Sequence, residues 1–151
     1  MEIAFRLAKA EDADAVAKVV QENLGGEFAP KKVSASLVRE KIKDRKDIFV
    51  AAVSEGEIIG VSRASFEDVD LAEIRWLAVC GKRRNGGIGT RLVEETLEAL
   101  KRLGKRKVTA RVRAGSETPA AIFSRLGFEK EGYFRGHYRK GVDIIQFGKF
   151  L

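Results

Sequence analysis

Three glycines stand within four positions just ahead of a long amphipathic segment. The stretch RRNGGIGTRLVEETLEAL runs from Arg83 to Leu100 and contains Gly86, Gly87 and Gly89. The first N–H groups of a helix have no partner inside it, so they can donate hydrogen bonds to an anion. Glycine has no Cβ atom to keep a phosphate away from these amides. The spacing therefore predicts a pyrophosphate cradle at the start of a helix, with a plain structural turn as the alternative.

Two widespread phosphate motifs do not fit this stretch. A Walker loop needs a Lys-Ser or Lys-Thr pair after its last glycine, and the stretch has neither. A dinucleotide fingerprint starts at Gly87-Ile88-Gly89, but Leu92 stands where its third glycine should be. The segment also does not follow the N-terminal strand, where that fingerprint belongs. We therefore predict neither a P-loop nor a Rossmann site.

The hydrophobic pattern predicts the elements that position this turn. The predicted order is β-α-α-β-β-β-α-β-α-β-β, with one right-handed crossover and one parallel pair of strands around the glycine stretch. This gives a mixed, mostly antiparallel α/β sheet with helices on both faces. The predicted strands cover residues 2–8, 47–55, 57–66, 72–79, 107–114 and two within 132–150, and the predicted helices cover 11–24 (ended by Gly25-Gly26), 34–44 (capped by Ser34), 87–103 and 118–128 (capped by Thr118).

Composition narrows the class of protein. A chain of 151 residues predicts one domain, 1–151. One cysteine, Cys80, excludes an internal disulfide, and with only one histidine, His137, we expect no metal site. No apolar run is long enough to span a membrane and no signal segment is recognisable, so we expect a cytoplasmic protein.

The net charge of +7 attracts anions. Few amide side chains and many charged ones resemble a thermophile's composition, which offers another reason for the basic surface. No interleaving of aromatic and basic residues supports a nucleic-acid partner.

Several segments together resemble the GNAT superfamily of N-acetyltransferases. Arg84-x-x-Gly87-x-Gly89 looks like its R/Q-x-x-G-x-G/A signature, FRLAKAEDADAVAKVV resembles its opening strand and helix, and AEIRWLAV its fourth strand. The segment ending in Gly127-Phe128 resembles its late helix, and the final strand pair resembles the C-terminal hairpin of ribosomal-protein alanine acetyltransferases. The resemblance covers nearly the whole chain. It implies the single-domain GNAT fold, with about seven strands and a splayed parallel pair.

The resemblance implies acetyl-CoA as cosubstrate and no metal. The pyrophosphate is expected on the backbone N–H groups of residues 84–90, and the pantetheine arm on the backbone of the fourth strand, where the N–H near Val79 polarises the acetyl carbonyl. The cofactor-binding residues so implied are Leu77, Ala78, Val79, Arg84, Asn85, Gly86, Gly87, Ile88, Gly89, Thr90, Ser116 and Phe123.

Glu73 is the first candidate for the general base. The segment AEIRWLAV is very similar to the strand of GNAT histone acetyltransferases whose glutamate is the base, and Glu73 occupies that place. Strict alternation puts Glu73, Arg75, Leu77 and Val79 on one face of the strand. The alternative is that Glu73 only pairs with a cation. Alanine acetyltransferase relatives carry the base on the next strand, where this chain has Arg111, which cannot accept a proton.

The proton donor is where the chain departs most from the family. The tyrosine that many relatives carry on the late helix is Phe123 here, and an asparagine that contacts the cofactor is Ser116. A thiol with a pKa near 8.5 leaves tolerably as a thiolate without help. Alternatively, Tyr133 or Tyr138 of the closing strands reaches the sulfur, and we name Tyr138 as the candidate. For either tyrosine the competing interpretation is an edge-packed ring with its hydroxyl in water.

These observations predict an acetyl-CoA-dependent N-acetyltransferase that transfers the acetyl group directly to a primary amine. The acceptor is a protein N-terminus, a lysine or a small-molecule amine, and basic segments near the predicted acceptor site favour one with an acidic or carboxylate feature. The alternative is a CoA- or acetyl-CoA-binding sensor with little turnover. We expect no nucleic-acid or membrane partner, and pairing of terminal strands in a homodimer stays open.

Overall fold

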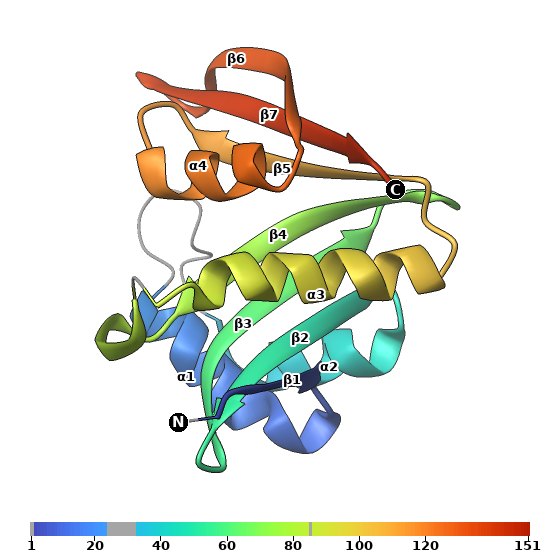
Figure 1. Cartoon of the computed structure of the whole chain (residues 1–151), viewed down its shortest axis with the longest axis vertical. Coiled ribbons are helices and arrows are strands. Elements are labelled where there is room, and N and C mark those ends of the chain that lie inside the picture. Colours follow the sequence, from blue (N-terminus) through green and yellow to red (C-terminus); the bar gives the residue numbers. More distant parts are fainter. Residues whose placement is uncertain (1, 24–32, 85) are drawn as a thin grey trace.

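A seven-stranded mixed sheet forms the centre of the molecule (Figure 1). The computed structural model describes residues 2–23, 33–84 and 86–151. The strand order is β1-β2-β3-β4-β5-β7-β6, and β4 and β5 form its parallel pair. This confirms the predicted fold class. The strands are β1 Ala4–Leu7, β2 Asp47–Ser54, β3 Glu57–Phe66, β4 Leu71–Val79, β5 Lys107–Arg113, β6 Glu129–Arg139 and β7 Val142–Phe150.

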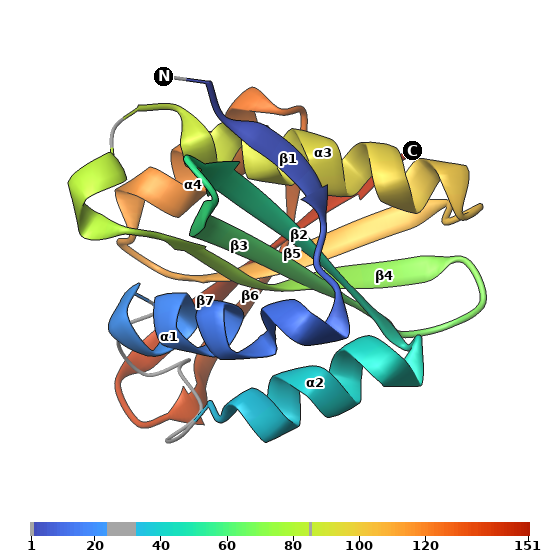
Figure 2. The same ribbon diagram turned by 90° about the horizontal axis from the view of Figure 1, so that it is seen from below.

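Helices cover both faces of the sheet (Figure 2). On one face lie α1 (Ala13–Asn23) and α2 (Ala35–Asp44), which bury Val16, Val20 and Val38 against Phe49 and Trp76. On the other lie α3 (Ile88–Arg102) and α4 (Glu117–Arg125). None of the helices within the described ranges combines the length and the apolar character needed to cross a bilayer.

Local signals in the sequence account for most element boundaries. The Ser34 hydroxyl accepts a hydrogen bond from the Leu37 N–H at 3.1 Å, which confirms the predicted cap of α2. The predicted cap of α4 is wrong, because this helix begins at Glu117 rather than after Thr118. Pro119 is then its third residue, a first-turn position whose missing N–H costs no helical hydrogen bond. The predicted stop at Gly25-Gly26 lies outside the described residues.

A bulge in β4 changes which side chains share a face. Arg63 of β3 lies opposite Trp76 and Ala64 lies opposite Ile74, so Arg75 is an extra residue in β4. The prediction that Glu73 shares a face with Leu77 is therefore wrong. Ile74 and Leu77 pack with the α3–α4 side, while Glu73 lies on the other face, together with Trp76. Alternation has a period of two, and one inserted residue reverses it.

A buried ion pair ties β2 to β3 beneath Trp76. Asp47 and Arg63 lie 3.0 Å apart, with side chains 4% and 12% exposed, and the guanidinium lies over the Trp76 ring. We expect Asp47→Ala to lower the free energy of unfolding by about 3 kcal/mol or more, because the Arg63 charge loses its partner in a buried place. Urea unfolding measures this loss.

The exposed pair of Asp70 and Arg106, also at 3.0 Å, provides the matched control. Asp70→Ala should cost no more than about 1 kcal/mol, because water screens that pair. Equal losses in the two variants would contradict a special role for the buried pair.

Candidate active site

The backbone of β4 carries unpaired polar groups where it parts from β5. The Cys80 N–H donates to the Ile59 carbonyl at 2.9 Å, which fixes the phase of the ladder between β3 and β4. In an antiparallel ladder every second residue directs its N–H and C=O to the same neighbour. Leu77 and Val79 therefore direct theirs away from β3, toward β5. The pairing of β4 with β5 ends at Ile74 and Ala110, so within the described residues no strand meets them there.

The glycine stretch lies at the N-terminus of α3, next to this gap between β4 and β5. Gly87 is the N-cap residue and has φ +79°, a conformation that other residues rarely adopt. A Cβ atom at Gly89 would lie 3.2 Å from the Ile122 side chain of α4, tighter than ordinary van der Waals contact. Glycine at this position therefore lets the start of α3 approach α4 closely. The Arg84 side chain folds back over the gap, its Nε 3.4 Å from the Val79 carbonyl.

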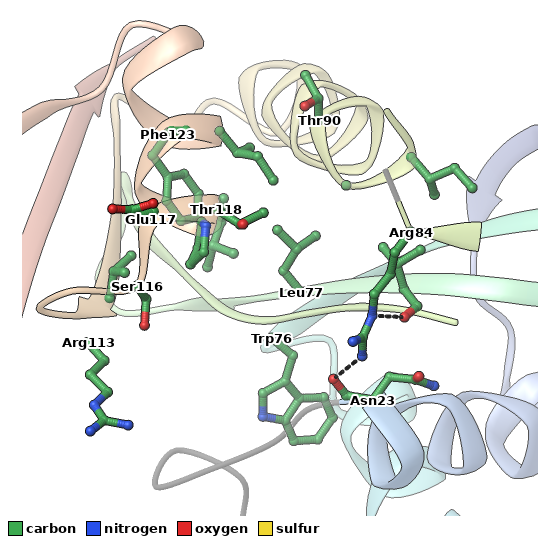
Figure 3. Close-up of a pocket in the computed structure, with 18 of the residues that line it drawn as sticks. Asn23, Trp76, Leu77, Arg84, Thr90, Arg113, Ser116, Glu117, Thr118 and Phe123 are labelled. Carbon is green, nitrogen blue, oxygen red and sulfur yellow. Dashed lines mark hydrogen bonds between the residues drawn. The ribbon is translucent and has the colours of Figure 1, made fainter. Parts of the chain in front are cut away.

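A cleft of about 1040 Å³ follows the gap and is lined by residues from both faces of the sheet. Figure 3 shows Leu77 on the α3 side of β4 and Trp76 on the opposite side, and both line the cleft. Two molecules can thus approach the same point from opposite faces. Its lining comprises Glu22, Asn23, Ile74, Arg75, Trp76, Leu77, Val79, Arg84, Gly87, Ile88, Gly89, Thr90, Arg111, Val112, Arg113, Ser116, Glu117, Thr118, Pro119, Ala121, Ile122, Phe123 and Arg125.

The cleft brings together most of the predicted cofactor residues. Those at its surface are Leu77, Val79, Arg84, Gly87, Ile88, Gly89, Thr90, Ser116 and Phe123. Ala78 is not among them, since its side chain is buried on the α1 side, and neither is Gly86. Asn85 lies outside the described residues. Glu73 and Tyr138, also predicted to be catalytic, are not among the residues that line the cleft.

Sequence reasoning missed several cleft residues. Trp76 is 5% exposed and packs in the core, but it also lines the cleft. Arg113 alternates with Arg111 along β5, a signal that could have placed both on one face. No comparable signal marks Asn23, whose carbonyl accepts a hydrogen bond from Arg84 at 3.5 Å, because this contact joins residues far apart in sequence.

A polar cluster lies on the face opposite α3, where β4, β5 and β7 meet. Glu73 is 7% exposed; one carboxylate oxygen pairs with Arg75 at 2.8 Å and the other accepts a hydrogen bond from Thr109 at 3.3 Å. Arg111 donates to the Tyr138 hydroxyl at 2.6 Å. This hydrogen bond is the main reason that the pKa of Arg111 lies above its ordinary value, so this side chain is a permanent cation.

Comparisons with known proteins identify this arrangement. The sequence model of the Acetyltransferase (GNAT) family matches residues 13–128. An uncharacterised N-acetyltransferase of Chlorobaculum tepidum is 34% identical over 125 residues, which cover 83% of this chain and 74% of the relative. The chain belongs to the GNAT acetyltransferase family. It is therefore an acetyl-CoA-dependent acetyltransferase, as its sequence predicted.

Solved structures with the GNAT fold superpose on almost the whole chain. The ribosomal-protein-alanine N-acetyltransferase of Brucella melitensis has a TM-score of 0.85 at 21% identity, covering 98% of this chain and 99% of its own. The Salmonella typhimurium protein yncA, solved with its cofactor acetyl-CoA, has a TM-score of 0.89 at 13% identity, covering 100% and 95%. At these identities the likeness concerns the fold.

Two side chains of this GNAT protein limit the chemistry of its cleft. Phe123 stands where many members of the family carry a tyrosine. The centroid of its ring lies 5.0 Å from that of Phe128 and 6.0 Å from that of Phe147. It contributes an apolar wall and no proton. Cys80 is a free thiol that does not line the cleft, which agrees with transfer that bypasses a cysteine intermediate.

Proposed function

We propose that this GNAT protein transfers an acetyl group from acetyl-CoA directly to a primary amine, in a complex that holds both substrates at once. The observation that carries the proposal is the cleft between β4 and β5, which residues from both faces of the sheet line. Acetyl-CoA enters from the α3–α4 side and the amine from the side of α1 and α2. The amine then attacks the thioester carbon without an intermediate on the protein.

The residues fit acetyl-CoA through main-chain groups. The N–H groups around Gly87, Ile88, Gly89 and Thr90 lie at the N-terminus of a 15-residue helix and suit a pyrophosphate. The backbone of Leu77 and the Val79 N–H, which point away from β3, suit the amides of the pantetheine arm. The Val79 N–H is our proposed donor to the acetyl oxygen, where negative charge develops during attack. Arg84, Ser116 and Phe123 complete the cofactor side of the cleft.

Glu73 is our proposed general base. An amine must lose a proton in the reaction, and a base acts at hydrogen-bond distance or through one bridging water. Glu73 is buried behind Arg75 and Arg111, which both line the cleft. We therefore propose that a water relays the amine proton to its carboxylate.

Tyr138 stays a prediction as the proton donor. Its hydroxyl contacts Arg111 and is one side chain away from the cleft. A donor of this kind contributes about 10²-fold or more to kcat, so Tyr138→Phe should lose that much. An unchanged kcat would mean that the thiolate leaves unprotonated.

Release of the CoA thiol in the presence of a panel of amines tests the function. Alanyl peptides, lysyl peptides and small amines should show which kind of acceptor accelerates release above hydrolysis. Acetyl-CoA that stays bound and intact with every amine would indicate a sensor and would overturn the proposal.

A further inference from the structure

The side of the cleft that faces α1 carries a guanidinium, that of Arg111, whose hydrogen bonds go to neutral groups. We propose that the acceptor amine also carries a carboxylate, which Arg111 binds. This inference rests on the proposed acetyl transfer. Arg111 lies on β5 between Ala110 and Val112, whose side chains pack toward α3 and α4. Alternation therefore directs Arg111 to the opposite face, the one from which the amine approaches.

Neutral groups hold the Arg111 guanidinium in place. Its Nε donates to the Gln146 Oε1 at 3.0 Å, and its Nη1 donates to the Tyr138 hydroxyl at 2.6 Å. Its Cζ atom lies over the Phe134 ring, 5.3 Å from the ring centroid. These contacts fix its position and leave its charge in place. A guanidinium has five N–H donors, so several remain for a ligand. A side chain fixed in advance loses little entropy when it binds a carboxylate.

Glu73 lies within ion-pair distance of Arg111 but makes no hydrogen bond to it. Its nearest oxygen lies 3.9 Å from the Arg111 Nε, a distance beyond a hydrogen bond. The same carboxylate is committed to Arg75 at 2.8 Å. Arg75 in turn also binds Glu67 at 2.5 Å and Ser65 at 3.0 Å. Arg75 therefore binds two carboxylates at hydrogen-bond distance, whereas Arg111, which lines the cleft, binds no carboxylate of the described residues at that distance.

The charge balance of the cleft supports the same class of acceptor. Among the described residues that line it, five are arginines and two, Glu22 and Glu117, are acidic. Without Arg84, which we assign to the cofactor side, four arginines still outnumber these two glutamates. A lining of this sign attracts an anion and repels a polycation. It therefore disfavours polyamines and runs of lysine as acceptors.

The strand register places Arg111 at the start of the gap. The pairing of β4 with β5 ends at Ile74 and Ala110, so Arg111 is the first residue of β5 beyond it. The Val79 N–H, our proposed donor to the acetyl oxygen, lies farther along the same gap. An acceptor that reaches from Val79 to the Arg111 side chain can therefore place its amine at the thioester and its carboxylate at the guanidinium.

Matched pairs of amines test this inference. One pair is 4-aminobutyrate and 4-aminobutyramide, and the other is the peptide amides Ala-Glu-NH2 and Ala-Gln-NH2; the two pairs separate a small-molecule source of the carboxylate from a peptide source. We expect the wild type to favour the carboxylate member of one pair in kcat/KM, chiefly through KM. Arg111→Gln should reduce that preference roughly 10- to 100-fold, as expected for a lost charged hydrogen bond.

Two further variants separate binding from folding and from general charge. Arg111→Lys keeps the charge and should keep part of the preference. Arg135→Gln removes one charge from the exposed β6 strand, away from the cleft, and should leave the preference unchanged. If Arg111 only held β5 to β7, its variants would lower the rates with both members of a pair equally.

Calorimetric titration of the four amines, with and without CoA, gives a readout that does not need turnover. Carboxylate-selective binding that disappears in Arg111→Gln would support the site even if no amine releases thiol, and only the proposed function would then fail. Equal treatment of both members of each pair in binding and in turnover, or no binding and no turnover of any of them, would overturn the inference.

Discussion

Replacement of Gly87 by valine should weaken acetyl-CoA binding by about 10- to 100-fold. Gly87 has φ +79° at the N-cap of α3, and a β-branched residue cannot hold that conformation without strain. The backbone there must shift, and the N–H groups that we assign to the pyrophosphate shift with it. Loss of one hydrogen bond to a charged group costs about 1.5–3 kcal/mol, which corresponds to this change in Kd. Calorimetric titration with acetyl-CoA measures it.

The other end of the same helix supplies a matched control. Gly104 has φ +82°, and a Cβ atom there meets nothing within 4 Å, as at Gly87. Gly104→Val should therefore lose about the same stability, on the order of 1–2 kcal/mol, and keep its affinity for acetyl-CoA. An unchanged Kd in Gly87→Val, or equal losses of affinity in both variants, would remove the glycine stretch from the cofactor site.

Replacement of Glu73 by glutamine should lower kcat by about 10²- to 10⁴-fold, the usual contribution of a general base. Glutamine has nearly the same shape, its amide oxygen can still accept a hydrogen bond from Arg75 and its amide nitrogen can donate one to the Thr109 hydroxyl, so we expect the variant to fold and to bind acetyl-CoA. The measurement is thiol release over a range of pH, with the best acceptor amine. Above the pKa of the amine, where little proton removal is needed, the difference from wild type should shrink.

Glu67 provides the control for charge and for the position of Arg75. It pairs with the same guanidinium at 2.5 Å, but it lies outside β4, in the connection between β3 and β4. Glu67→Gln should stay within a few-fold of wild-type kcat, since a partly exposed pair contributes little. A wild-type rate in Glu73→Gln at every pH would assign Glu73 to the ion pair alone.

The sequence by itself determined the element order, the mixed sheet and the glycine stretch before a helix. These features depend on local rules: helical spacing of apolar residues, β-branched runs, and glycines where the chain must turn. The motif from Arg84 to Gly89 and the Gly127-Phe128 helix end also identified the family. Such short motifs can be recognised from the sequence alone, because their residues are close together along the chain. The cap of α4 was misplaced by two residues, since Ser116 makes no side-chain bond that its sequence neighbours would reveal.

Tertiary structure alone decided which side chains meet at the cleft. Arg75 is an extra residue in β4, and this single insertion moved Glu73 to the face opposite Leu77. Nothing in AEIRWLAV marks the bulge, because it arises from register with β3 rather than from the strand's own residues. The same holds for Arg111: its contacts with Gln146 and Tyr138 span 35 and 27 positions along the chain. Periodicity predicts a face within one strand, whereas the partner across a sheet follows from how distant strands pair.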